Sequence, residues 1–184
     1  MWRREGWIVL VAAILLAGAA IAAQSPRFGV GRTPTEEDTR PLGVVVAPDG
    51  TGLPAGSGTA VEGKVVFTTR CAECHGPAGD GAVGPALVGG KGTLATPTPK
   101  KTVGSYWPYA TTVWDYVNRA MPFNQPGTLS PDEVYAVSAY LLFLNDIVGE
   151  QQVIDARSLP LIRMPNRDGF VSDPRPDIAP RRQE

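Results

Sequence analysis

The only two cysteines and the only histidine of this chain lie within five consecutive positions, Cys71-Ala72-Glu73-Cys74-His75. The spacing C-x-x-C-H is typical of the attachment of a c-type haem, in which two thioethers hold the porphyrin and the histidine binds the iron. A redox dithiol does not need the adjacent histidine, and a zinc site needs about three or four protein ligands. We therefore predict one covalent haem c held by Cys71, Cys74 and His75, with the fold built around it.

Glycine and proline are frequent in this chain, with 21 and 18 residues among 184. We therefore expect much of the chain to form loops, turns and extended segments. A buried haem would compensate for this, because its flat apolar face removes a large area from water. The formal net charge of −1 argues against a nucleic-acid-binding protein, which needs a basic face.

The N-terminal segment has the pattern of an exported protein. Arg3 and Arg4 precede an apolar run over residues 7–23, which ends in small residues with an A-x-A cleavage motif. A run of this length is slightly long for a signal peptide and at the lower limit for a membrane span, so residues 1–23 are either a cleaved signal or a retained anchor. Both alternatives predict that the rest of the chain is periplasmic, with the arginines on the cytoplasmic side.

Composition divides the remainder into three parts. Residues 24–56 are rich in proline and glycine and are predicted to be a linker, which either extends freely or packs in order against its own domain. Residues 57–149 contain the periodic apolar patterns of a folded domain. Residues 150–184 are predicted to be a proline-rich tail, which lacks regular structure from Asp155 onward.

Three helices are predicted in the domain. Apolar side chains at near-helical spacing predict helices over residues 59–70 and 110–120. A third helix begins after Ser130, because Ser130 and Glu133 form a capping box, and it ends before Gly149. We therefore expect an all-α fold in which helices and long loops surround the haem.

An electron-carrying haem is best held by two protein ligands, and a His/Met pair raises the reduction potential relative to a His/His pair. The chain has no second histidine, so the second ligand must be a methionine, and Met1 lies in the targeting segment. Met121 lies between two predicted helices, whereas Met164 lies in the tail. A compact wrap places the ligand loop before the closing helix, so we predict that His75 and Met121 bind the iron.

These features resemble the class I cytochromes c. The segments that carry the resemblance are Gly63 and Phe67, Cys71 to Gly76, Gly84-Pro85-Ala86-Leu87, Met121-Pro122, and Tyr140-Leu141. The family implies a class I cytochrome c fold, with three or more helices around one haem and extended N- and C-terminal segments. It also implies that the first and last helices cross at Gly63, where a glycine lets two backbones approach closely, and that Tyr140 packs beside this crossing. The Pro85 carbonyl is implied to accept a hydrogen bond from the His75 ring and to fix its orientation.

A narrower resemblance links the chain to the cytochrome subunits of bacterial sulfite dehydrogenases and of the Sox sulfane dehydrogenase. It rests on four segments, which are residues 101–112, 119–123, 164–170 and 174–177. The resemblance implies a molybdenum-containing dehydrogenase subunit as the electron donor and another cytochrome c or an oxidase as the acceptor. The sulfane dehydrogenase cytochrome is usually a dihaem protein, so the single haem motif here favours the sulfite dehydrogenase type.

Four polar residues are candidates for binding the haem propionates. Tyr106 and Trp107 each carry a donor on an apolar ring, and the alternative is that both rings pack in the core. Lys101 and Arg119 either neutralise the propionates or stay solvated, as exposed charges usually do. No residue of the chain is predicted to be catalytic.

The sequence therefore predicts a periplasmic monohaem protein that transfers single electrons, with the cofactor carrying the redox chemistry. The leading hypothesis is the cytochrome subunit of a sulfur-compound dehydrogenase. One alternative is a freestanding or membrane-tethered carrier between respiratory complexes. A haem enzyme or gas sensor with an open iron site is the other alternative, and ligation by Met121 argues against it.

Overall fold

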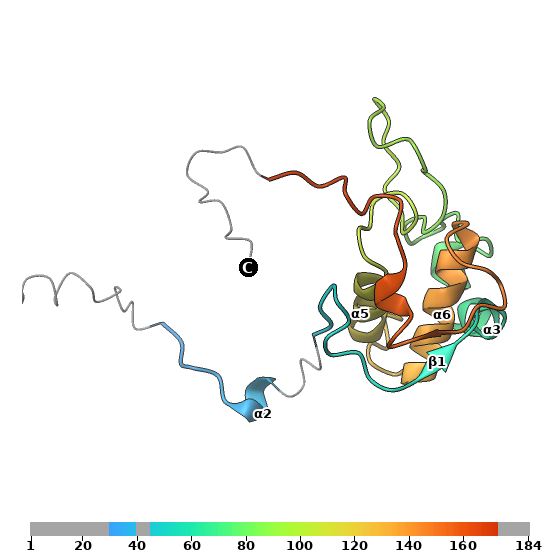
Figure 1. Ribbon diagram of the computed structural model, residues 1–184. Coiled ribbons are helices and arrows are strands. Elements are labelled where there is room, and N and C mark those ends of the chain that lie inside the picture. The colour runs from blue at the N-terminus through green and yellow to red at the C-terminus, as the bar shows by residue number, and fades with distance from the viewer. Residues whose placement is uncertain (1–29, 40–44, 173–184) are drawn as a thin grey trace, which may run out of the picture. The chain divides into compact units, whose positions relative to one another are not determined.

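A computed structural model describes residues 30–39 and 45–172 of the chain, which are drawn in colour in Figure 1. The predicted signal or anchor at residues 1–23 lies outside the described residues. The same is true of residues 174–177, the last of the four segments that resemble dehydrogenase cytochromes.

The chain divides into two compact units, residues 1–39 and residues 40–184. The described part of the first unit contains the short helix α2 (Glu36–Thr39). There the Arg32 guanidinium, 2.6 Å from the Asp38 carboxylate, holds the pKa of that carboxyl far below its usual range. Within the two described ranges, no helix is long and apolar enough to cross a membrane.

The described part of the second unit contains the predicted helices together with two short strands. Its elements in chain order are β1 (Ser57–Gly58), α3 (Ala60–Arg70), α4 (Ala72–His75), α5 (Ala110–Ala120), α6 (Pro131–Leu144), β2 (Ile154–Asp155) and the 3-10 helix η2 (Leu159–Leu161). The predicted helices over residues 59–70 and 110–120 are confirmed as α3 and α5. The helix expected after Ser130 is confirmed as α6, which ends five residues before Gly149.

Capping boxes fix the residues at which α3 and α6 begin. The Thr59 and Ser130 hydroxyls each accept a hydrogen bond from the third N–H of their helix. In return, the Glu62 and Glu133 carboxylates accept hydrogen bonds of 2.8 Å from the N–H groups of Thr59 and Ser130. The hydrogen bonds from Ser130 lower the pKa of Glu133. The start of each helix is therefore set by side chains that accept hydrogen bonds from the otherwise free N–H groups of the first turn.

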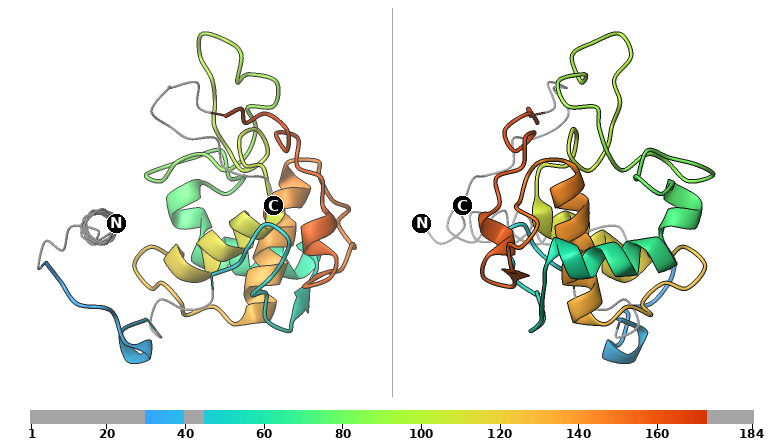
Figure 2. Two further views of the ribbon diagram at one scale, coloured as in Figure 1. Left: turned by 60° about the vertical axis from the view of Figure 1, so that its left-hand side comes forward. Right: turned by 90° about the vertical axis from the view of Figure 1, so that its right-hand side faces the viewer.

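Helices α3 and α6 cross at Gly63, as the family resemblance implies. Figure 2 shows α3 passing across α6. Gly63 is buried, and a Cβ placed on it would collide with the Ala136 carbonyl group of α6. Beside this contact the Phe67 and Tyr140 rings pack with their centroids 5.3 Å apart. A residue without a side chain is therefore required at position 63.

Segments before and after the helices pack against them. Strand β1 pairs with β2 in antiparallel register, Ser57 with Asp155. Val46, Ile154, Leu159 and Met164 are buried in the common core. The expectation that the chain lacks regular structure from Asp155 onward is therefore wrong for the part up to η2, because Asp155 belongs to β2 and η2 follows it. Residues 46–58 pack against the domain. This agrees, for that part of the predicted linker, with the alternative that it packs in order on its own domain.

Tyr135 of α6 joins the N-terminal segment to the core. Its ring is buried and packs on Trp114 with a centroid distance of 5.4 Å. Its hydroxyl donates a hydrogen bond to the Pro54 carbonyl at 2.9 Å. Burial, with a smaller effect of the nearby Asp155 carboxylate, raises the pKa of Tyr135 to about 12 from 10.0.

Tyr135→Phe should therefore show a characteristic pH dependence. Between pH 10 and 12 the unfolded chain releases the phenolic proton before the folded chain does, so the contribution of Tyr135 to stability is complete below pH 10 and is lost as the pH rises. At pH 8 the variant should be less stable by about 1 kcal/mol, because the hydrogen bond to Pro54 is missing. Urea unfolding followed by circular dichroism should show this difference shrinking above pH 10 and changing sign before pH 12, and a difference that is constant with pH would contradict the assignment.

Candidate haem site

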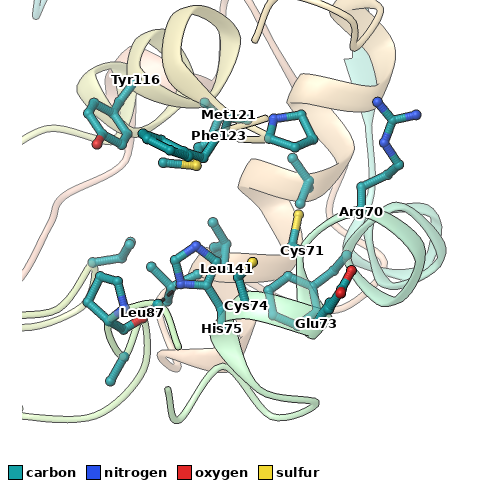
Figure 3. A pocket seen from close by; sticks show the side chains of 18 of the residues that line it. Arg70, Cys71, Glu73, Cys74, His75, Leu87, Tyr116, Met121, Phe123 and Leu141 are labelled. Atoms are coloured by element: carbon teal, nitrogen blue, oxygen red, sulfur yellow. Dashed lines mark hydrogen bonds between the residues drawn. The ribbon is translucent and has the colours of Figure 1, made fainter. Parts of the chain in front are cut away.

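A cavity of about 880 Å³ lies between α3, α4, α5, α6 and the loops that connect them. Its size is in the range of cofactor pockets. Its walls are largely apolar, formed by Phe67, Leu87, Val103, Trp107, Val113, Val117, Val137 and Leu141. Figure 3 shows the cysteine and histidine side chains along one side of this cavity. The helices thus leave an apolar space at the motif that the sequence singles out.

His75 is the last residue of α4 and lines the cavity. Its Nδ1 lies 2.7 Å from the Pro85 carbonyl oxygen. A carbonyl can only accept, so Nδ1 carries the proton and Nε2 keeps a lone pair for a metal. The Gly84 N–H donates to the Cys74 carbonyl at 2.7 Å and holds this loop against α4. The hydrogen bond implied for Pro85 is therefore confirmed.

Cys71 and Cys74 also line the cavity and are free thiols. Cys71 connects α3 to α4, with its N–H donating to the Phe67 carbonyl at 2.9 Å. Burial raises the pKa of the Cys71 thiol to about 11. Little Cys71 thiolate then forms at neutral pH, whereas a reactive redox dithiol usually contains one thiol with a lowered pKa. Within the described ranges no group of three or more His, Cys, Asp or Glu side chains could hold a metal ion.

Met121 lies on the opposite wall of the cavity from His75 (Figure 3). It is the C-cap residue of α5, and its N–H donates to the Val117 carbonyl at 3.0 Å. Met164 is only 1% exposed in the hydrophobic core and does not line this cavity. The placement of both methionines supports Met121 as the partner of His75.

Two of the four candidates for propionate binding line the cavity, and the other two do not. Trp107 and Lys101 line the cavity, and the Trp107 ring packs edge-on against Tyr116 at 5.6 Å. Tyr106 does not line the cavity, because its ring packs edge-on against Phe170 at 5.3 Å. This placement does not support a propionate contact from Tyr106, and the contact from Trp107 stays a prediction.

Arg119 also does not line the cavity, because it is held by Asp115 one turn earlier on α5. Asp115 is buried, accepts a 3.1 Å hydrogen bond from Arg119 Nε and accepts another of 3.1 Å from the Val46 N–H. It thereby fixes the N-terminal segment to the helix that leads to Met121. The i, i+4 spacing of Asp115 and Arg119 is the only signal in the sequence for this pair.

Comparison with known proteins identifies the family. A family model described as cytochrome c matches residues 60–145. A chain in the crystal structure of the sulfane dehydrogenase SoxCD from Paracoccus pantotrophus is 42% identical, with a TM-score of 0.73 over 82% of this chain and 75% of that chain. The chain belongs to the cytochrome c family.

A weaker likeness of this cytochrome is to a chain of the thiosulfate dehydrogenase TsdBA from Marichromatium purpuratum. That chain is 23% identical with a TM-score of 0.35, and the match covers 54% of this cytochrome and 20% of that chain. No curated protein matches the sequence.

The cavity of this cytochrome fits a covalent haem c. Two thiols lie beside an imidazole whose Nε2 is free, a thioether faces them, and the remaining walls are mainly apolar. When bound, the haem supplies a one-electron Fe(III)/Fe(II) couple. The protein is thus a class I cytochrome c with an electron-transfer role, in agreement with the fold class predicted from the sequence.

Proposed function

We propose that this cytochrome is the monohaem electron-transfer subunit of a periplasmic sulfur-compound dehydrogenase. It receives single electrons from a molybdenum-containing subunit and passes them to another cytochrome c or an oxidase. The observation that carries this proposal is the 42% identity over 82% of the chain to a chain of a sulfane dehydrogenase. Residues 7–23 either direct export or tether the protein to the inner membrane.

The residues of the site are arranged for electron transfer in which no bond forms or breaks. His75 and Met121 occupy opposite walls, so neither has to move when the charge of the site changes. The largely apolar lining offers water few hydrogen-bond partners, and the Pro85 carbonyl holds the imidazole in one orientation. Little reorganisation therefore opposes the gain or loss of an electron.

The cavity opens to solvent beside the second cysteine. Cys74 is exposed, and two apolar residues of the lining, Val83 and Phe123, are 89% and 85% exposed. Electrons would enter and leave near this opening, since a partner can approach it closely. A freestanding carrier would use the same opening, so the site alone does not distinguish it from a subunit.

Isolation of the native complex tests the proposal. An affinity tag at the C-terminus of the full chain should recover iron and molybdenum in comparable amounts, and sulfite or thiosulfate should reduce the haem of the isolated material. Iron without molybdenum, together with no reduction by either sulfur compound, would favour the freestanding carrier instead. Mass spectrometry of the same material would decide whether residues 1–23 are retained.

A further inference from the structure

The loop after α5 begins with the proposed iron ligand Met121, which is the C-cap residue of that helix. We name residues 121–129 the methionine loop. Its residues 123–128 are exposed, whereas Pro122 and Leu129 on either side of them are buried. Inside the loop, the Gln125 N–H donates a hydrogen bond to the Pro122 carbonyl at 2.8 Å. Burial therefore fixes the two ends of the methionine loop but not its middle.

One side chain from another element holds the middle of the methionine loop. The Arg70 Nη2 group donates to the Gln125 Oε1 atom at 3.1 Å and to the Thr128 hydroxyl at 2.7 Å. The Thr128 hydroxyl in turn donates to the Gln125 carbonyl at 2.8 Å. In the part of the chain that the structure describes, the two contacts from Arg70 are the only hydrogen bonds that join residues 122–129 to another segment.

Arg70 lies next to the haem attachment motif. It is the last residue of α3 and directly precedes Cys71. Arg70 and Gln125 both line the haem cavity, and Figure 3 shows the Arg70 side chain extending from beside Cys71 towards the wall that carries Met121. The contact therefore joins the segment that would attach the porphyrin to the loop that would bind the iron.

A different role is open to an arginine at this position. A cation in the last turn of a helix stabilises that helix through its dipole, and Arg70 is the basic residue in the last turn of α3. This role requires no contact with the methionine loop and predicts no effect at the iron. The two roles therefore differ in what the loss of Arg70 does to Met121.

We propose that Arg70 is a positioning residue, which latches the methionine loop and thereby keeps the Met121 thioether on the iron. The inference rests on the proposed function and on ligation by Met121, because it names a residue that holds the site in one state of ligation. Without the latch the loop opens more often and leaves the iron accessible. An added ligand binds only this open form, so its apparent affinity rises in proportion to the open fraction.

Imidazole titration of the ferric, haem-loaded full chain measures the open fraction. Imidazole suits iron as a ligand better than a soft thioether does, and loss of the far-red band reports the departure of Met121. Arg70→Leu should bind imidazole about fivefold more tightly, which is the effect of one ordinary hydrogen bond on an equilibrium constant. Thr128→Val should act in the same direction. The double variant should show less than the product of the two effects, because both changes remove the same contact.

Arg157→Leu is the matched control, since it removes the same charge from an exposed position outside the methionine loop. It should bind imidazole like the unchanged protein. Equal affinities of Arg70→Leu and Arg157→Leu would overturn the latch, and so would independent effects of Arg70→Leu and Thr128→Val. If Arg70→Leu does not fold, an unchanged imidazole affinity of Thr128→Val, which alters an exposed residue, is the overturning result.

The same titration separates the latch from the assignments on which it rests. An unchanged protein without the far-red band would refute ligation by Met121, and the latch with it. A protein that has the band but shows no effect of Arg70→Leu would refute the latch alone. Isolation of the native complex tests the proposed function independently, because it requires no imidazole and none of these variants.

Discussion

Replacing Met121 by leucine should abolish the far-red methionine–iron charge-transfer band and let the ferrous protein bind carbon monoxide. Met121 faces His75 across the cavity, and leucine keeps the size and apolar character of the side chain while removing the sulfur. Such a volume-conserving change usually costs less than about 1.5 kcal/mol, so the variant should still fold. The reduction potential should fall, because the thioether ligand is what raises it.

Met164→Leu is the matched control for this experiment. Met164 is buried in the core but does not line the cavity, so this variant should keep the far-red band and exclude carbon monoxide. Absorption spectra of the two ferric variants, followed by carbon monoxide addition to the reduced proteins, make the comparison. Loss of the band in Met164→Leu and its survival in Met121→Leu would show that the ligand assignment is wrong.

Gly63→Ala should lower the free energy of unfolding by about 3 kcal/mol, near the upper end of the usual cost of overpacking a core. The added Cβ would meet the Ala136 carbonyl, which is backbone and cannot rotate away. Alanine normally favours a helix over glycine by about 1 kcal/mol, so a loss of stability has to come from the crossing. Because Phe67 and Leu141 of the same two helices line the cavity, the haem surroundings should loosen as well.

Gly149→Ala provides the control for Gly63→Ala. The nearest atom to a Cβ at Gly149 is the Gln152 Cβ at 4.0 Å, an ordinary contact. This variant should stay within about 0.5 kcal/mol of the unchanged protein, as surface substitutions usually do. Urea unfolding of the haem-loaded variants measures both values. Equal stability of the two variants would mean that α3 and α6 do not depend on close approach at position 63.

Local sequence signals predicted the parts of the fold that depend on neighbouring residues. The Cys71–His75 motif and the Ser130 capping box each depend on residue types at fixed spacing, and the structure contains both features. The crossing of α3 and α6 at Gly63 was instead implied by the family resemblance, and the structure contains it too. The hydrogen bond from His75 to Pro85 followed from the family resemblance. In each case the chemistry of a few residues leaves one arrangement open.

Contacts between distant segments could not be predicted in the same way. Strands β1 and β2 have two residues each, too few for an alternating pattern to be detected. The hydrogen bond from Val46 to Asp115 joins positions 69 residues apart. Tyr106 and Trp107 are neighbours with similar chemistry, and only the course of the backbone decides that Trp107 alone lines the cavity.

The absorption spectrum of the reduced full-length protein, recorded before and after addition of carbon monoxide, tests haem ligation by His75 and Met121 most directly. We expect the Soret band of a low-spin haem that carbon monoxide leaves unchanged, because His75 and Met121 would both bind the iron and leave no open site. A protein without a Soret band, or one whose band shifts because carbon monoxide enters an open axial position, would contradict this ligation.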